Sequence, residues 1–207
     1  TEHRAKFTNV KLSLPSGASL FLKTFERIKA PKWEYYKPTK NSYKILGNWN
    51  FKLIKGGPDT DFSKKIDRMN SWTKWSKKME AFSGTAQYEI KFKRPSEHKG
   101  PWLLELGDVR ESAKIWLNGK FIGTLWSNPY QLKIKSLKKG KNSLRIQVTN
   151  LGANRIKAKE AGGEEWKNFY NINIVGLDYQ PFDTSKWDVL KAGLIENPIL
   201  KPLEVYE

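Results

Sequence analysis

The sequence predicts an all-β fold, and more narrowly an antiparallel β-sandwich. Apolar and polar residues alternate with a period of two in several segments, which is typical of strands with one buried and one exposed face. An Asn-Gly pair between two such segments indicates a tight hairpin. Strands do not alternate with long amphipathic helices, so a parallel α/β sheet is not favoured.

The clearest strand covers residues 84–93. Its even positions from Ala86 to Phe92 are apolar, while its odd positions carry Gln, Glu or Lys. Residues 113–117 have the same pattern and run into Asn118-Gly119, so residues 120–126 are expected to form the partner strand of a hairpin. Further strands are expected over residues 10–14, 19–24, 43–54, 102–109, 130–134, 144–148, 170–175 and 194–205.

The composition divides the chain into residues 1–40 and residues 41–207. Residues 30–41 combine prolines, lysines and clustered aromatic residues, and they are interpreted as a connector. The two strands before it are joined at Pro15-Ser16-Gly17, and a two-stranded hairpin alone is marginally stable in water. They are expected either to pack on the sandwich or to be the tail of a preceding domain. Residues 41–207 are expected to form a self-sufficient domain, in which only residues 61–70 could hold a short helix.

Charge and cysteine content exclude several classes of protein. The 207 residues carry 38 Lys and Arg against 21 Asp and Glu, for a formal net charge of +17. Cysteine is absent, which excludes disulfides, thiolate metal sites and thiol nucleophiles. The apolar runs are far shorter than the roughly 20 residues of a membrane-spanning helix. The start has neither Met nor a signal core, so the chain is interpreted as a mature product or a piece of a larger one.

The positive charge is concentrated over residues 131–160, which hold nine Lys and Arg residues and the single acid Glu160. Most of these cations occupy the outward positions of alternating strands, and no nucleic-acid signature with interleaved aromatics accompanies them. Nucleic acid is therefore not favoured as a partner. A preference for acidic glycans and a simply lysine-rich, soluble surface both remain open.

Catalytic and metal-binding signatures are weak. The two histidines, His3 and His98, have no recognisable Ser or Asp partner, and no G-x-S-x-G elbow occurs. Asp59-Thr60-Asp61 resembles the start of a calcium loop, but Asn70 stands where such a loop needs a bidentate Glu. No cofactor is expected, although a structural calcium held partly by backbone carbonyls remains open. A pair of glycosidase carboxylates is not favoured, and the sequence alone does not exclude it.

Aromatic residues beside polar ones give the more useful functional signal. Sugars present flat C–H faces that stack on Trp and Tyr, while Asn, Arg or Gln bind the hydroxyls. Trp72 lies in a polar stretch, and Trp126 and Tyr130 flank a loop at the end of a predicted strand. The alternative for each ring is that it caps the end of the sandwich.

An ordered set of motifs resembles the sugar-binding jelly-roll domain of glycoside hydrolase family 2. It is most similar to the C-terminal β-sandwich of the α-L-rhamnosidase-like family 106 enzymes. The motifs lie at residues 71–73, 82–88, 104–110, 115–120, 123–126, 129–130, 140–144, 148–150, 154–155 and 192–195. The match covers residues 43–207, and residues 15–21 resemble the closing hairpin of a preceding domain. Glu196-Asn197-Pro198 replaces the Gly-Pro that the family usually has after 192–195.

The resemblance implies a galactose-binding-like jelly roll that accompanies a catalytic barrel of the same parent chain. The catalytic carboxylates of such enzymes belong to the barrel, so the resemblance transfers no catalytic residue to this chain. The loops at residues 126–128 and 150–155 are expected to face an oligosaccharide or polysaccharide. The residues expected to contact it are Trp72, Trp126, Tyr130, Asn150, Asn154 and Arg155.

The leading hypothesis is therefore a non-catalytic carbohydrate-binding or structural module of a glycoside hydrolase. Such a parent enzyme is expected to be secreted, periplasmic or attached to the cell surface. Two alternatives remain open: a purely structural accessory domain without a ligand of its own, and a small standalone glycosidase.

Overall fold

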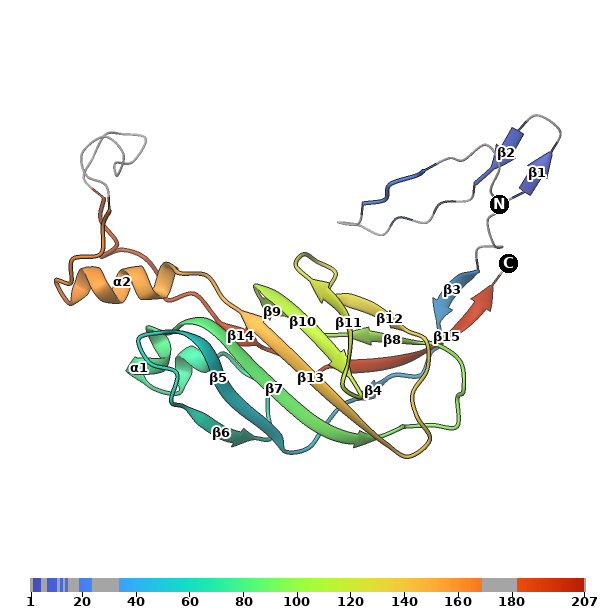
Figure 1. Cartoon of the computed structure of the whole chain (residues 1–207), viewed down its shortest axis with the longest axis horizontal. Coiled ribbons are helices and arrows are strands. Elements are labelled where there is room, and N and C mark those ends of the chain that lie inside the picture. The colour runs from blue at the N-terminus through green and yellow to red at the C-terminus, as the bar shows by residue number, and fades with distance from the viewer. Residues whose placement is uncertain are drawn as a thin grey trace.

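The computed structural model describes residues 2–4, 7–10, 12, 14, 19–23, 34–168 and 182–206. Within these residues the fold is an antiparallel β-sandwich, which confirms the predicted fold class (Figure 1). One sheet has the spatial order β11-β10-β13-β7-β5-β6 and the other β12-β8-β15-β3, with β4 also paired to β15. Two small sheets pair β1 with β2 and β9 with β14.

Strands β7, β10, β11, β12 and β13 each overlap a predicted segment, whereas the predicted strands 43–54, 102–109 and 194–205 are each divided into two. The six-stranded sheet contains β5 (Trp49–Gly57), β6 (Ser63–Ile66), β7 (Ser83–Lys93), β10 (Ser112–Leu117), β11 (Lys120–Leu125) and β13 (Lys141–Thr149). The five-stranded sheet contains β3 (Tyr35–Pro38), β4 (Tyr43–Lys44), β8 (Trp102–Glu105), β12 (Gln131–Ile134) and β15 (Ile199–Tyr206). The remaining elements are β1 (Glu2–Arg4), β2 (Phe7–Asn9), β9 (Val109–Arg110), β14 (Gly193–Leu194), a 3-10 helix η1 (Trp72–Lys74), α1 (Lys77–Glu80) and α2 (Ala153–Ala161).

The hairpin between β10 and β11 forms as predicted. Leu117 pairs with Lys120 across the turn, and Asn118 and Gly119 have φ values of +52° and +80°. Positive φ at both central residues is what a type I′ turn requires, and Asn and Gly tolerate it at the least cost. The turn therefore fixes which residues of β10 point into the sandwich.

The core lies between the two sheets and is rich in aromatic rings. Phe51 on β5 packs against Tyr88 on β7, with their ring centroids 5.0 Å apart, and against the ring of Trp72 at 6.0 Å. The facing sheet contributes Trp102 and Leu104 from β8, both without exposed surface. Burying such rings removes about 150–250 Å² of surface each from water, so this contact between sheets dominates the stability of the fold.

The expected helix at residues 61–70 does not form, because β6 occupies Ser63–Ile66 and pairs with β5. The longest described helix is α2, which the sequence analysis did not predict. It contains only one large apolar residue, Ile156, so it has no apolar stripe to detect. Its Ala, Lys, Arg and Glu residues have high helix propensity, and this was the available signal. With nine residues, α2 is far shorter than the roughly 20 needed to cross a bilayer, and no helix of the described ranges is long and apolar enough to do so.

The N-terminal segment differs from the expectation. Its described hairpin pairs β1 with β2, whereas the described residues of 10–14 and 19–24 are not in strands. The expected junction at 15–17 and the expected strand at 170–175 lie outside the described residues. Strand β3, from the segment interpreted as a connector, pairs with β15 from Tyr35↔Tyr206 to Pro38↔Leu203.

Candidate functional site

Trp126 follows β11 at the rim of the six-stranded sheet, and 75% of its surface is exposed. Strands β11 and β13 flank β10 and run in the same direction, so Leu125 and Thr149 end at the same edge. Leu125 and Val148 both pair with Ala113, so two strand spacings of about 4.8 Å separate their backbones by roughly 10 Å. The fold thus brings the predicted loops at 126–128 and 150–155 to one end of the sheet.

Tyr130 anchors the loop that carries Trp126. Only 8% of Tyr130 is exposed, and its hydroxyl donates to the backbone carbonyl of Glu111 at 2.6 Å. Its own carbonyl accepts the N–H of Leu106 at 2.9 Å, and burial raises the pKa of its phenol. The expected sugar contact of Tyr130 is therefore corrected to a role in positioning the loop.

Trp72 is a core residue, contrary to the expectation of a sugar contact. It has no exposed surface, and its ring centroid lies 5.8 Å from that of Phe82. Its backbone N–H donates to the carbonyl of Ala192 at 3.1 Å. A Cβ added to Gly193 would come within 2.7 Å of the Trp72 ring, so residues 192–193 close directly over it.

Asn150 continues the pairing of β13 with β7 rather than facing outward. Its side-chain oxygen accepts the N–H of Gly84 at 2.8 Å, and its side-chain nitrogen donates to the carbonyl of Phe82 at 3.0 Å. The backbone N–H of Asn150 also donates to the Gly84 carbonyl at 3.1 Å. Both ends of the side-chain amide are therefore used in holding the end of β7.

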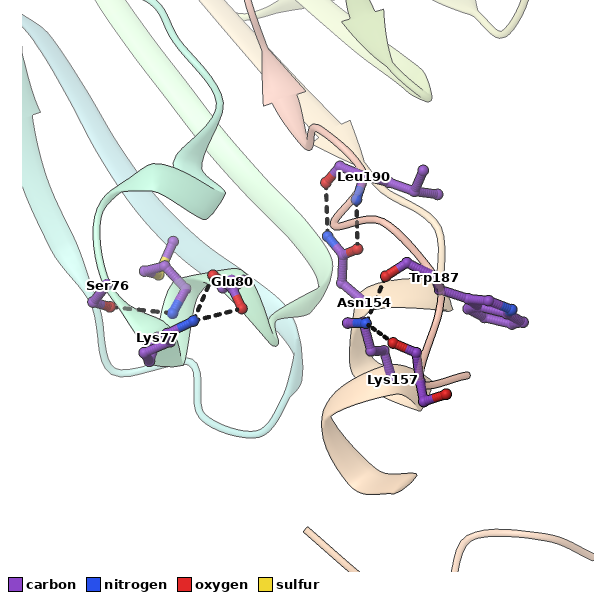
Figure 2. Close-up of polar contacts among 9 residues, drawn as sticks. Ser76, Lys77, Glu80, Asn154, Lys157, Trp187 and Leu190 are labelled. Atoms are coloured by element: carbon purple, nitrogen blue, oxygen red, sulfur yellow. Dashed lines mark hydrogen bonds and ion pairs between the residues drawn. The ribbon is translucent and has the colours of Figure 1, made fainter. Parts of the chain in front are cut away.

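Asn154, on the first turn of α2, binds the chain that returns toward β14 (Figure 2). We call residues 182–190 the strap. The Asn154 side-chain nitrogen donates to the Leu190 carbonyl at 2.8 Å, and its oxygen accepts the Leu190 N–H at 2.9 Å. Asn154 is buried, and both its side-chain nitrogen and its oxygen bind Leu190, so its predicted role as a sugar ligand is corrected to a structural one.

Lys157 lies one turn further along α2 and binds the same strap. Its ammonium group donates to the backbone carbonyls of Thr184 and Ser185 at 3.4 and 3.2 Å. It also donates to the carbonyl of Trp187 at 2.5 Å, as Figure 2 shows. Residues three apart on a helix share a face, so Asn154 and Lys157 act together. The sequence analysis missed Lys157 because it did not predict the helix.

Arg155 and Trp126 are the two predicted site residues that remain available. Arg155 is half-buried and makes no hydrogen bond or ion pair with the part of the chain that the structure describes. A cavity of about 10 Å³, about the volume that one water needs, lies where β13 leads into α2. It is lined by Glu111, Asn150, Leu151, Ala153, Asn154, Leu190 and Lys191. This small cavity could hold a water but not a sugar, so Trp126 and Arg155 are the residues left for a ligand at this end.

Three carboxylates have pKa values below their usual range. Hydrogen bonds from Lys167 and from the Trp166 indole lower the pKa of Glu160, and those from the Ser185 N–H and hydroxyl lower that of Asp183. Lys78 lowers the pKa of Asp59 in the same way. The general acid of a glycosidase needs a raised pKa, so all three shifts run in the opposite direction.

The described ranges hold no group of three or more acidic, His or Cys residues that could bind a metal. Asp59, the start of the possible calcium loop, is paired with Lys78. A calcium held mainly by backbone carbonyls stays a prediction.

Comparison with known proteins decides the family. The family described as "Glycosyl hydrolase 2 galactose-binding domain-like" matches residues 66–188. The chain belongs to this family. Its sandwich is thus a galactose-binding-like domain of the kind found in glycoside hydrolases, as the motif resemblance implies.

Relatives of this galactose-binding-like domain are much longer proteins. A protein named "Putative beta-glucuronidase" from Formosa agariphila is 37% identical over 101 residues, which cover 46% of this chain and 9% of that relative. The solved rhamnosidase of Novosphingobium sp. PP1Y matches with a TM-score of 0.64 and 24% identity, over 86% of this chain and 16% of the enzyme. A family 2 β-galacturonidase of Eisenbergiella tayi matches with a TM-score of 0.50 and 16% identity, over 82% of this chain and 25% of that one. These two structural matches show the fold.

Proposed function

We propose that this galactose-binding-like domain is a non-catalytic carbohydrate-binding module of a glycoside hydrolase. The catalytic barrel of an α-L-rhamnosidase-like parent chain would be its partner. The proposed ligand site is the end of the six-stranded sheet that carries Trp126 and, after β13, Arg155; we call it the loop-end surface. The parent enzyme would be secreted, periplasmic or attached to the cell surface.

The exposure of Trp126 carries this proposal. It is the most exposed tryptophan of those the structure describes, on a loop that Tyr130 fixes to the sandwich. An exposed indole on a fixed loop offers a flat apolar face for the C–H surface of a sugar, at little cost in conformational entropy. Arg155 supplies guanidinium donors for hydroxyl or carboxylate oxygens at the same end of the sheet.

Support for a non-catalytic role comes from the carboxylates. The lowered pKa values of Asp59, Glu160 and Asp183 favour the ionised form, whereas protonation of a leaving group needs a carboxyl that keeps its proton near neutral pH. The relatives named above are several times longer than this chain, which leaves room in them for a separate catalytic domain.

Calorimetric titration of the chain with a panel of neutral and acidic oligosaccharides tests the proposal. Trp126→Ala is expected to weaken binding about two- to tenfold, since an aromatic contact is worth about 0.5–1.5 kcal/mol. Trp187→Ala, which removes a partly exposed indole from the strap, is the matched control and should leave binding unchanged. Unchanged affinity in both Trp126→Ala and Arg155→Gln would overturn the loop-end surface as the ligand site. Turnover of an aryl rhamnoside or galactoside by the pure chain would instead identify a standalone glycosidase.

A purely structural accessory domain is the second candidate. It is favoured by the use of Trp72, Tyr130, Asn150 and Asn154 in internal contacts. The same titration separates the two, because a structural domain would bind none of the oligosaccharides.

A further inference from the structure

A row of side chains crosses the outer face of the six-stranded sheet. Trp116 on β10 pairs with Arg145 on β13, and Arg145 pairs in turn with Glu89 on β7. Glu89 pairs with Asn50 on β5, which pairs with Lys65 on β6. On β10, β13, β7 and β5 the neighbours of these residues are buried in the core, so the row faces outward; on β6 the neighbour Ile66 is buried as well. The row joins an aromatic ring, two cations, a carboxylate and an amide across five adjacent strands.

The outer face is hollowed along this row. The hollow has a volume of about 520 Å³, within the roughly 300–1,000 Å³ of small-molecule sites. Figure 1 shows that the sheet curls from β6 to β11. We call the hollow the sheet-face groove; it is lined by Asn48, Asn50, Lys65, Glu89, Ile90, Lys91, Trp116, Gly119, Ser143, Leu144 and Arg145. Its five-strand row spans four spacings of about 4.8 Å, or roughly 19 Å, enough for a short oligomer.

Arg145 is held in place without using its hydrogen-bond donors. Its guanidinium carbon lies 4.7 Å from the centre of the Trp116 ring, and the Phe121 ring braces Trp116 edge-on at 5.4 Å. The Glu89 carboxylate is 4.0 Å from the Arg145 Nε, beyond hydrogen-bond distance. Among the described residues no hydrogen bond uses the guanidinium. A stacked, oriented guanidinium with unused N–H groups is suited to bidentate binding of a carboxylate or sulfate.

The other lining residues favour an anionic, hydroxyl-rich ligand. Lys65 and Lys91 are exposed and add two cations to Arg145, against the single carboxylate of Glu89. Asn48, Asn50 and Ser143 add neutral donors and acceptors of the kind that bind sugar hydroxyls.

We propose that the sheet-face groove binds an acidic saccharide. Arg145 binds the carboxylate or sulfate group, and Lys91 and Lys65 bind further charges along the groove. Asn50 and Ser143 bind hydroxyls, while the Trp116 ring packs against the C–H surface of one unit. This site goes beyond the loop-end surface, because it lies on a different part of the sheet and uses none of the same residues.

Nucleic acid fits the groove less well. Single-stranded nucleic acid is bound by successive exposed aromatic rings on which its bases stack. The groove lining contains one half-buried indole, and one face of that indole is already covered by Arg145.

The test is a calorimetric titration of the 207-residue chain with an oligomer of galacturonic acid, a sulfated galactose oligomer and a neutral galactose oligomer of equal length. The galacturonate or the sulfated oligomer is expected to bind at least about tenfold more tightly than the neutral one, and the better of the two identifies the anionic group. Arg145→Gln should weaken that binding about tenfold or more, as expected for a charge-assisted hydrogen-bond pair. Lys135→Gln, which removes a cation just after β12 of the other sheet, should leave it unchanged.

Two further variants protect the test against a folding artefact. Glu89→Gln removes the only carboxylate of the groove and should tighten binding of the acidic oligomer severalfold, which a misfolded chain could not do. Trp126→Ala should leave the groove's affinity unchanged, so that failure of the loop-end surface and failure of the groove are distinguishable. Equal binding of neutral and acidic oligomers would overturn the proposal. So would full affinity in both Arg145→Gln and Trp116→Ala, or tighter binding of an oligothymidylate than of any saccharide.

Discussion

The two faces of the six-stranded sheet use the same backbone for opposite purposes. On β5, Phe51 points inward and contacts four other rings, whereas its neighbour Asn50 points outward into the groove. On β10, Ile115 is fully buried while Trp116 stands on the outer face. The inner face stabilises the fold by excluding water from rings and branched side chains. The outer face keeps charged and polar groups that contribute little to folding, which leaves them available for a ligand.

The largest difference between the faces is expected for adjacent residues of β5. Phe51→Ala should lower the free energy of unfolding by about 4 kcal/mol, because it removes a fully buried ring and leaves a cavity among its neighbours. Lys52→Ala, one position further on the outer face, should change it by less than about 0.5 kcal/mol. Urea unfolding of the two variants measures both values. Similar losses in the two variants would mean that the outer face contributes to the stability of the fold as much as the inner face does.

Gly193→Ala should cost about 3 kcal/mol. Gly193 has a φ of +102°, and an added Cβ would lie 2.5 Å from the Tyr88 hydroxyl and 2.7 Å from the Trp72 ring. Backbone strain and overpacking therefore both contribute to the destabilisation of Gly193→Ala. Gly140→Ala is the matched control, since Gly140 has a φ of +82° but no atom within 4 Å of an added Cβ. If urea unfolding gives the same loss of stability for both variants, the overlap of the added Cβ with Tyr88 and Trp72 does not contribute to the loss in Gly193→Ala.

A smaller effect on the stability of the fold is expected from raising the pH, through the ionisation of Tyr88. Tyr88 is fully buried, and burial raises the pKa of its phenol, while the Leu194 N–H donates to its oxygen at 3.1 Å. The folded pKa exceeds the unfolded value of about 10, so this stabilisation is intact below pH 10 and is lost as the pH rises from there toward the folded pKa. The slope contributed by Tyr88 is at most about 1.4 kcal/mol per pH unit.

Tyr88→Phe isolates that contribution. The variant should be less stable than the wild type at pH 7 by about 1 kcal/mol, since the Leu194 N–H loses its acceptor. Its stability should fall less steeply above pH 10 in urea unfolding. Equal slopes in the two proteins would show that Tyr88 can ionise within the fold.

The sequence predicted the features that depend on local pattern. Alternation around Tyr88 and the Asn118-Gly119 turn predicted β7 and the β10–β11 hairpin, and both follow from neighbouring residues alone. The motif resemblance predicted the galactose-binding-like sandwich, which the family match confirms.

Features that depend on distant residues were predicted less well. Trp72 lies in a polar stretch, but residues 192–193, more than a hundred positions later, close over it. Asn154 is a polar residue in a polar segment, which favours an exposed position. It is buried instead, because the distant residue Leu190 binds its side chain. Trp116, by contrast, was detectable, because a large aromatic residue at an outward position of an alternating strand departs from the pattern.

The way in which α2 holds the strap has a consequence for redesign. Asn154 and Lys157 bind only main-chain atoms of residues 184, 185, 187 and 190. Main-chain recognition is indifferent to the identity of the residue held. The outward side chains of the strap could therefore be substituted, as in a display scaffold, while Asn154 and Lys157 continue to hold its backbone against α2.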